Sequence, residues 1–297
     1  LLPLKFSSHK KLLEAHKEKA INIDLLVICT PSGLHAKQTI ETARYGINIC
    51  TEKPMALNVK DAEKMIKICK KNNVKLFVVK QNRFNKTLLD LKSKIKEGKF
   101  GKIGLVVLNV FWQRPQSYYD QANWRGTKKL DGGALMNQAS HYVDLLEWMI
   151  GPIKSVSCKL ATISRDIESE DTAVLNLKWD QGMLGSMAVT MITFPKNIEG
   201  SITVIGDNAS AKVGGEALNK YEFYYSDEMQ DENYTKNLSY EIKNIYGSGH
   251  FDYYKNMLDS LINDLPAICD GQSGLSSIKI ICAAYLSSKN GKEVKLK

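Results

Sequence analysis

The stretch LLVICTPSGLHAKQTIETARYGINICTEKPM, residues 25–55, decides the fold of this chain. Its first run, LLVICT (25–30), is continuously apolar and stops at a Pro-Ser-Gly turn, as a strand buried on both faces does. The segment HAKQTIETARYG (35–46) then spaces its apolar residues like a helix and ends in glycine. A second strand-like run, INICT (47–51), follows it. Strand, helix and strand in this order predict a parallel sheet.

The same alternation continues to about residue 80. DAEKMIKICKKNN (61–73) is predicted to be a helix and KLFVV (75–79) a third strand. Short links between such elements indicate a doubly wound sheet, which binds its ligands at the carboxyl ends of the strands. Those ends are Thr30-Pro31, Thr51-Glu52-Lys53-Pro54 and Lys80-Gln81-Asn82.

Beyond residue 98 strands dominate. IGLVVLNVFW (103–112) is strand-like, and a helix is predicted from about residue 133 to residue 149. Further strands and two closing helices are predicted at 155–164, 172–179, 183–191, 201–206, 251–264 and 273–288, with a hairpin turn at 180–182. We therefore predict an α/β chain of two domains, a parallel doubly wound domain at 1–98 and an α+β domain at 99–297.

Composition narrows the classes of function. The net charge of +9 suits an anionic ligand such as a nucleotide. The lysines are scattered as on solvated helix faces, without an aromatic RNA-binding signature, so we do not expect nucleic-acid binding. No apolar run approaches the roughly 18 residues of a membrane span, and no signal peptide opens the chain. The cysteines form no C-x-x-C; Cys29 and Cys50 are expected to be buried, in a reducing cytoplasm.

Four segments at or near the predicted strand ends carry a family resemblance: ICTPSGLH (28–35), EKPMAL (52–57), QNRFN (81–85) and GGALMNQASHYVD (132–144). In this order they resemble the signatures of the Gfo/Idh/MocA oxidoreductases over essentially the whole chain. The resemblance implies an N-terminal Rossmann domain that binds NAD or NADP. It also implies a C-terminal domain whose open, largely antiparallel sheet mediates oligomer contacts, in a homodimer or homotetramer.

Within that family, WRGTKKLDGGALMNQASHYVDLLEWMIG (124–151) is most similar to the bacterial UDP-N-acetylglucosaminuronic acid 3-dehydrogenases of surface-polysaccharide synthesis. Asn137 and Ala139 stand where the usual family pattern has Asp and Gly, which favours this nucleotide-sugar branch. The resemblance implies NAD-dependent oxidation at C3 of an anionic nucleotide sugar. A dehydrogenase of a free sugar or inositol, and a catalytically silent ligand sensor on the same fold, are the alternatives.

One family feature is missing from the sequence. No G-x-G-x-x-G follows a strand, and there is no first βαβ unit with its acidic ribose-binding residue. By the resemblance Leu1 falls late in the Rossmann domain, so we expect the sheet to be incomplete, with its first strands lost. Dinucleotide binding should be poor if the chain starts there. The choice between NAD and NADP stays open.

Lys53 follows the second strand, at the edge where a parallel sheet presents its ligands. Desolvation and a cationic nicotinamide nearby would lower its pKa, so that it could relay the proton of the reacting hydroxyl. A surface salt bridge to Glu52 is the alternative for an isolated lysine. The family pattern favours the catalytic role.

His141 shares one face of the predicted helix 133–149 with Asn137 and Asp144. Such a polar stripe on an apolar helix is either a buried network or the wall of a site. The resemblance makes His141 the general base and Asp144 the residue that orients it. Whether His141 or Lys53 takes the proton first stays open.

The remaining polar candidates fall into two groups. Donors to the substrate would come from Arg83, Asn85, Asn137 and Gln138, with Arg suited to carboxylate and diphosphate groups. The cofactor would be held by Thr30, Pro31, Ser32, His35, Glu52, Lys53, Gln81, Trp124 and Arg125. We expect no metal site, because His9, His16 and His250 lack metal-ligand spacing.

Overall fold

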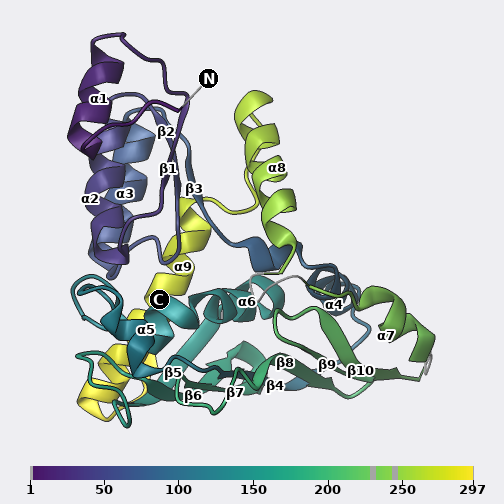
Figure 1. Cartoon of the computed structure of the whole chain (residues 1–297). Coiled ribbons are helices and arrows are strands. Elements are labelled where there is room, and N and C mark those ends of the chain that lie inside the picture. The colour runs from purple at the N-terminus through teal and green to yellow at the C-terminus, as the bar shows by residue number, and fades with distance from the viewer. Residues whose placement is uncertain (1–2, 228–231, 243–246, 297) are drawn as a thin grey trace.

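The computed structural model describes residues 3–227, 232–242 and 247–296. It contains two sheets, one above the other in Figure 1. The upper sheet has three strands in the order β1-β2-β3, all parallel: β1 (Leu25–Ile28), β2 (Asn48–Thr51) and β3 (Leu76–Val78). The lower sheet has eight strands. The predicted α/β class, with a short parallel sheet followed by an α+β part, is confirmed.

Helices lie on both sides of the upper sheet (Figure 1). The side chain of Asn58 accepts a hydrogen bond from the backbone N–H of Asp61 and so caps the N-terminus of α3. The central strand β2 is buried, with Ile49 and Cys50 fully covered, whereas Val27 of the edge strand β1 is 40% exposed. The helices are α1 (His9–Lys17), α2 (Ser32–Ala43) and α3 (Val59–Lys71) on one side and α8 (Gly249–Ile262) on the other.

The lower sheet runs in the order β10-β9-β8-β4-β7-β6-β5-β11. Its neighbours pair antiparallel except β4 with β7, which are parallel. Alternating buried side chains of the strands form the core beneath the helices that cover one face. The strands are β4 (Ile103–Phe111), β5 (Ile153–Ala161), β6 (Thr172–Trp179), β7 (Leu184–Thr190), β8 (Glu199–Gly206), β9 (Ala209–Gly214), β10 (Lys220–Ser226) and β11 (Val294–Lys295).

The long C-terminal helix α9 (Gly271–Asn290) joins the two sheets, running from the upper to the lower one in Figure 1. It packs on α3 and β3 above and on β5 and α6 (Ser140–Ile150) below. Gly274 allows the close approach, since a Cβ there would meet the Met55 side chain at 2.5 Å. Residues of both units therefore share one hydrophobic core.

The helix predicted from 133 to 149 is broken. A π-helical turn, Ala134–Gln138, is followed by Ala139, whose φ of −92° and ψ of 0° separate it from α6. The amide of Ala139 reaches back to the carbonyl of Ala134, which closes the wide turn. The turn faces the carboxyl ends of the upper strands, so it shapes the site described below.

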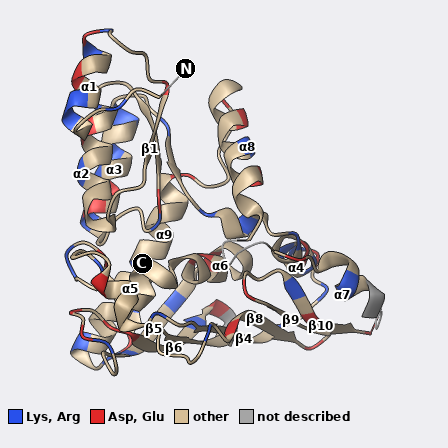
Figure 2. Cartoon of the chain, in the orientation of Figure 1, with Lys and Arg blue, Asp and Glu red and all other residues tan. Residues whose placement is uncertain are grey.

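Several elements are not predicted from the sequence pattern: α1, α4 (Lys86–Lys96), α5 (Gln116–Asp120), α7 (Glu232–Leu238), β9 and β10. Cys29 was expected to be buried but is exposed, because it follows the last residue of the edge strand β1. Lys and Arg residues are interspersed with acidic residues along the helices rather than gathered in one band (Figure 2). Among the described residues, no helix is long and apolar enough to cross a membrane.

Candidate active site

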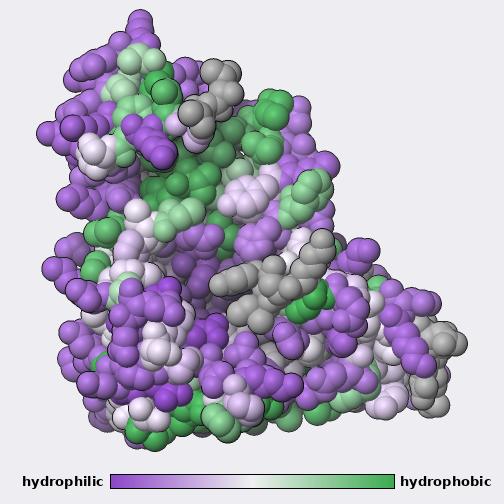
Figure 3. All heavy atoms as spheres, viewed as in Figure 1, coloured by the Kyte–Doolittle hydropathy of each residue, from purple (hydrophilic) through white to green (hydrophobic). Residues whose placement is uncertain are grey.

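A cavity of about 510 Å³ lies between the two units. Figure 3 shows the surface between the upper and lower parts hollowed and mostly hydrophilic. Strand ends of the upper sheet supply one wall, and the π-turn with the start of α6 supplies another. The lining residues are Glu52, Lys53, Gln81, Asn82, Trp112, Arg114, Tyr118, Asn137, Gln138, His141, Tyr142, Ala217, Gly247 and His250.

Lys53 reaches across this cavity from the end of β2. Its Nζ donates to both the backbone oxygen and Oδ1 of Asn137, each at 2.9 Å. The carboxylate of Glu52 accepts from the backbone N–H of Lys53 at 3.1 Å instead of pairing with its amine. Burial lowers the pKa of Lys53, although the nearby charges of Glu52 and Asp131 act in the opposite direction. The lysine is thus held in the cavity and biased toward its neutral form.

His141 lies in the first turn of α6. Its Nε2 is 3.3 Å from Nε2 of Gln81, whose amide donates to the ring. Burial, together with the positive charges of Lys53 and Lys80, holds the pKa of His141 well below its ordinary range. The imidazole is therefore neutral at physiological pH and able to accept a proton.

The structure does not bring Arg83 and Asp144 to the cavity. Arg83 binds both carboxylate oxygens of Asp144 at 2.7 Å, and Lys80 Nζ donates to the same carboxylate at 2.6 Å. Ser277 Oγ on α9 lies 3.2 Å from it. Asp144 therefore anchors a buried ion network between the units. Its side-chain hydrogen bonds go to Lys80, Arg83 and Ser277, so the expectation that it orients His141 by a direct hydrogen bond is wrong.

Of the two amide side chains Asn85 and Gln138, only Gln138 lines the cavity. Asn85 is 1% exposed, and its amide donates to the backbone oxygen of Ala217 at 2.8 Å, so it ties loops together behind the cavity. Gln138 lines the cavity itself. Neither amide atom of Gln138 has a hydrogen-bond partner among the described residues, which leaves this side chain available to a ligand.

Of the residues expected to hold the cofactor, Glu52, Lys53 and Gln81 line the cavity. Pro31 precedes the first turn of α2, and Thr30 Oγ1 donates to Gln38 at 2.6 Å. Because Gln81 Oε1 is buried without a partner in the described part of the chain, the edge formed by the three strand ends fits a polar ligand such as a nicotinamide amide.

Three other cofactor candidates lie outside this cavity. His35 is 1% exposed, and its ring nitrogens lie 2.7 Å from the Thr30 oxygen and 2.8 Å from the Pro54 oxygen. It therefore links two strand-end loops instead of presenting its side chain to a ligand. The Arg125 guanidinium lies over the rings of Tyr118 and Trp124, at 4.0 and 5.4 Å, beside the cavity wall.

The sequence analysis missed the residues that follow β4. Arg114 lies over the rings of Trp112 and Tyr118, at 5.1 and 5.4 Å, and all three line the cavity. His250 enters from the first turn of α8. The alternation of apolar residues in the strand predicts which face is buried. It does not predict that the segment after the strand lines a cavity.

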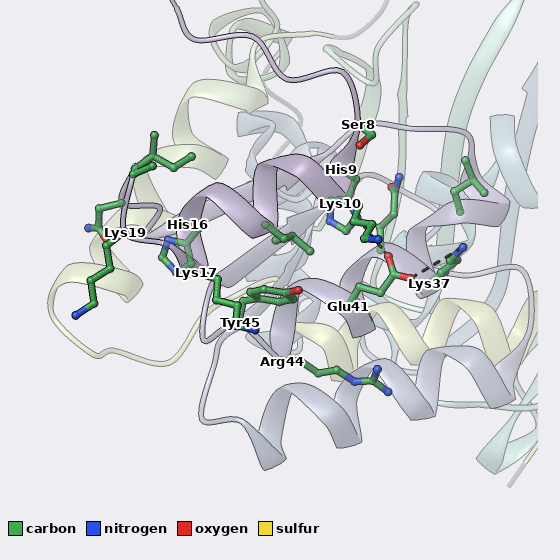
Figure 4. A pocket seen from close by; sticks show the side chains of 16 residues that line it. Ser8, His9, Lys10, His16, Lys17, Lys19, Lys37, Glu41, Arg44 and Tyr45 are labelled. Atoms are coloured by element: carbon green, nitrogen blue, oxygen red, sulfur yellow. Dashed lines mark ion pairs between the residues drawn. The ribbon is translucent and has the colours of Figure 1, made fainter.

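A larger hollow of about 1510 Å³ lies along α1 and α2, away from the strand ends (Figure 4). Its charged side chains pair with one another across the surface: His9 Nδ1 is 3.3 Å and Lys37 Nζ 4.0 Å from the Glu41 carboxylate. The Lys37–Glu41 pair is largely exposed, and the His9 ring also lies 2.9 Å from Thr42 Oγ1, so these contacts hold α1 on α2 and give no sign of chemistry. Across the described residues, no group of three or more His, Cys, Asp or Glu side chains is placed to hold a metal ion.

Comparison with solved structures gives two close matches. The WlbA dehydrogenase from Bordetella pertussis, crystallised with NADH and UDP-GlcNAcA, is 46% identical with a TM-score of 0.93, covering 98% of this chain and 83% of that one. The WlbA dehydrogenase from Chromobacterium violaceum, in the same type of complex, is 45% identical with a TM-score of 0.90, covering 98% and 81%.

More distant relatives share the fold. The scyllo-inositol 2-dehydrogenase (NADP(+)) IolW of Bacillus subtilis is 24% identical over 92% of this chain and 79% of its own length. The family model for the NAD-binding Rossmann fold of the GFO/IDH/MocA oxidoreductases matches residues 3–80, and that for their C-terminal alpha/beta domain matches residues 92–296. The chain therefore belongs to the Gfo/Idh/MocA oxidoreductase family.

Proposed function

We propose that this protein uses NAD to oxidise the C3 hydroxyl of UDP-N-acetylglucosaminuronic acid to a ketone. The observation that carries the proposal is that Lys53 and His141, from different units of the chain, line the same cavity at the strand ends. The bound NADH and UDP-GlcNAcA of the WlbA relatives support the choice of cofactor and substrate.

The hydrogen bonds of Lys53 define its part in the reaction. A neutral amine has two N–H groups and one lone pair, and both N–H groups are used by the oxygens of Asn137. The lone pair is then free to take the proton of the substrate hydroxyl as the C–H bond breaks. NAD, when bound at the strand ends, supplies the hydride acceptor.

His141 is the second proton-handling group. It is neutral because burial and the charge of Lys80 oppose its protonation. Once Lys53 has become an ammonium, its positive charge disfavours a second cation beside it, so the site takes up one proton per turnover. Both residues are needed, because Lys53 accepts the proton, whereas His141 positions the hydroxyl and passes the proton on.

The cavity suits an anionic sugar. Arg114 uses one guanidinium nitrogen on the backbone oxygen of Gln113, at 2.7 Å, and its other donors remain available to the uronate carboxylate. The unpartnered amide of Gln138 fits a hydroxyl or the N-acetyl group. Together they provide a charged and a neutral contact on the wall opposite the strand ends.

The test is formation of NADH by the purified protein, followed by absorbance. We expect turnover with UDP-N-acetylglucosaminuronic acid and much slower turnover with UDP-N-acetylglucosamine and myo-inositol, which lack the carboxylate. Turnover of myo-inositol as fast as that of the uronate would favour a dehydrogenase of a free sugar or inositol. Tight binding of both ligands by calorimetry, with no NADH formed, would favour a silent sensor.

For assembly, we propose that copies of the chain pair through the uncovered face of the eight-stranded sheet. Ile205, Leu105 and Leu184 are cross-strand neighbours on β8, β4 and β7, and they are 41%, 37% and 54% exposed. A continuous apolar row of this kind favours burial against a second sheet. Light scattering should give a multiple of the chain mass, and Leu105→Glu should lower it; an unchanged mass would exclude this face.

A further inference from the structure

A chain of hydrogen bonds leads from a backbone amide to the amine of Lys53. The N–H of Gly126 donates to Asp131 Oδ2 at 2.7 Å, and Asp131 Oδ1 accepts from the side-chain amide nitrogen of Asn137. The amide oxygen of Asn137 accepts from Lys53 Nζ. Asp131 is 1% exposed, lies outside the cavity lining, and can touch the substrate only through Asn137.

The backbone N–H of Gly126 fixes the donor-to-acceptor direction of these hydrogen bonds. A backbone N–H is always a donor, so the atom that faces Gly126 must be an acceptor. A carboxylate accepts at both oxygens and therefore requires Asn137 to present its NH₂ group to Asp131. The oxygen of Asn137 must then face Lys53, where it receives an N–H.

We propose that Asp131 is a positioning residue: it sets the orientation of the Asn137 amide and thereby keeps the free position of the Lys53 amine directed into the cavity. This inference rests on the proposed function, in which Lys53 takes the substrate proton. The π-turn contributes as well. The backbone oxygen of Asn137 receives side-chain donors, Lys53 Nζ at 2.9 Å and Ser140 Oγ at 3.1 Å, and so gives the amine its second acceptor.

An asparagine at position 131 would reverse the donor-to-acceptor direction of the hydrogen bonds between positions 131 and 137. In Asp131→Asn the new amide must turn its oxygen to Gly126, so its NH₂ meets the NH₂ of Asn137. Asn137 escapes this donor–donor contact only by rotating, which turns its own NH₂ toward Lys53. That NH₂ then occupies the lone pair of the amine or opposes its N–H groups, and in either case the amine is less available to the substrate hydroxyl.

The charges around Lys53 also shift its pKa in directions that can be assigned. The charged and titratable groups around Lys53 are Glu52, Asp131, Arg114 and His141. Burial lowers the pKa of Lys53, the carboxylates of Glu52 and Asp131 raise it, and Arg114 lowers it. Removal of the Asp131 charge therefore shifts the pKa of Lys53 downward. A carboxylate moved from 131 to 137, in contact with the amine, shifts it upward.

The experiment is a swap of the two side chains: D131N, N137D and the double variant D131N/N137D. D131N should lower kcat by about ten- to a hundredfold, from loss of a buried hydrogen-bonding arrangement at the base. N137D should also lower kcat, because two carboxylates then face each other. The double variant restores the direction of every bond and should recover to within about tenfold of the unmodified protein.

The pH profile distinguishes positioning from a purely structural role. Because Lys53 must be neutral to act, the acid limb of kcat should lie at higher pH in the double variant and at lower pH in D131N, whereas thermal stability alone would not move it. Defects that simply multiply in the double variant, or an unchanged kcat and pH profile in D131N, would overturn the proposal.

A second measurement is independent of turnover. The rate at which acetic anhydride modifies Lys53, followed by mass spectrometry over a pH series, reports the pKa of its amine in the free protein. We expect the midpoint to fall in D131N and rise in the double variant. If the protein oxidises no nucleotide sugar, the proposed function fails, and these midpoints still decide the role of Asp131: identical midpoints in all variants would refute it.

Discussion

Asp144→Asn changes the shape of the side chain little and removes its charge. The carboxylate now compensates Lys80 and Arg83 through three bonds of 2.6 to 2.7 Å, and all three side chains are at most 8% exposed. In the variant two buried cations lose their partner. Breaking a buried pair from one side costs about 3–5 kcal/mol, so we expect the free energy of unfolding to fall by that amount. This is a large fraction of the roughly 5–15 kcal/mol that holds a typical domain together.

The assay is urea unfolding at neutral pH, with an unchanged m-value as the condition for comparing midpoints. Asp264→Asn is the matched control: its carboxylate also pairs with a lysine, Lys75, at 2.8 Å, but it is 93% exposed and should contribute nothing measurable. A loss for Asp144→Asn no larger than that of the control would refute the reasoning.

The effect should also depend on pH in one direction. Burial raises the pKa of Asp144, but the charges and hydrogen bonds of Lys80 and Arg83 outweigh it and hold that pKa well below the ordinary value. A depressed carboxyl pKa stabilises the folded state above the unfolded pKa of about 3.9 and loses this contribution as pH falls toward the folded pKa. The gap between the unmodified protein and Asp144→Asn should therefore narrow in acid.

Three further predictions concern the site and its support. Lys53→Ala and His141→Ala should each lower kcat by orders of magnitude with little change in thermal midpoint, since each removes one proton-handling group; loss of folding would mean that they are core residues. Arg114→Leu should raise KM for the uronate substrate more than KM for UDP-N-acetylglucosamine; an equal effect on both would remove its assignment to the carboxylate. Burial raises the pKa of Glu170 to about 7, so unfolding free energy should decline as pH rises from about 4.5 to 7, and Glu170→Gln should flatten that decline; parallel curves would contradict it.

The parallel order of the upper strands and the position of Lys53 could be predicted from sequence because both follow from local rules. An apolar run ended by a turn predicts a buried strand, and its carboxyl end predicts where polar side chains meet. The cavity position of His141 was predicted from the polar stripe and the family pattern. Its distance of 3.3 Å from Gln81 depends on how α6 packs against the turn at Gln81–Phe84 that follows β3, which no local pattern encodes.

Asp144 shows where such rules end. Residues three apart on a helix point about 60° away from each other, which is close enough to count as one face and far enough to enter different environments. The π-turn before α6 sets how Asn137 lies relative to His141, and both line the cavity, whereas Asp144 turns to the buried ion network. Arg83 lies in the same buried region because a buried carboxylate is stable only when cations compensate its charge.

The buried ion network nevertheless bears on the chemistry. Lys80 and Arg83 carry two positive charges against the single carboxylate of Asp144, which leaves a surplus of one beside α6. Lys80 is among the groups that lower the pKa of His141. On the other side of the cavity the balance is reversed, since Asp131 and Glu52 both favour the protonated form of Lys53. Because the charge of Lys80 adds to burial in lowering the pKa of His141, whereas the charges of Glu52 and Asp131 oppose the effect of burial on Lys53, the two side chains can differ in proton affinity. In the proposed reaction, a proton leaving the substrate would therefore meet two acceptors of unequal strength, and the difference is set in part by Lys80 and Asp131, which lie outside the cavity lining.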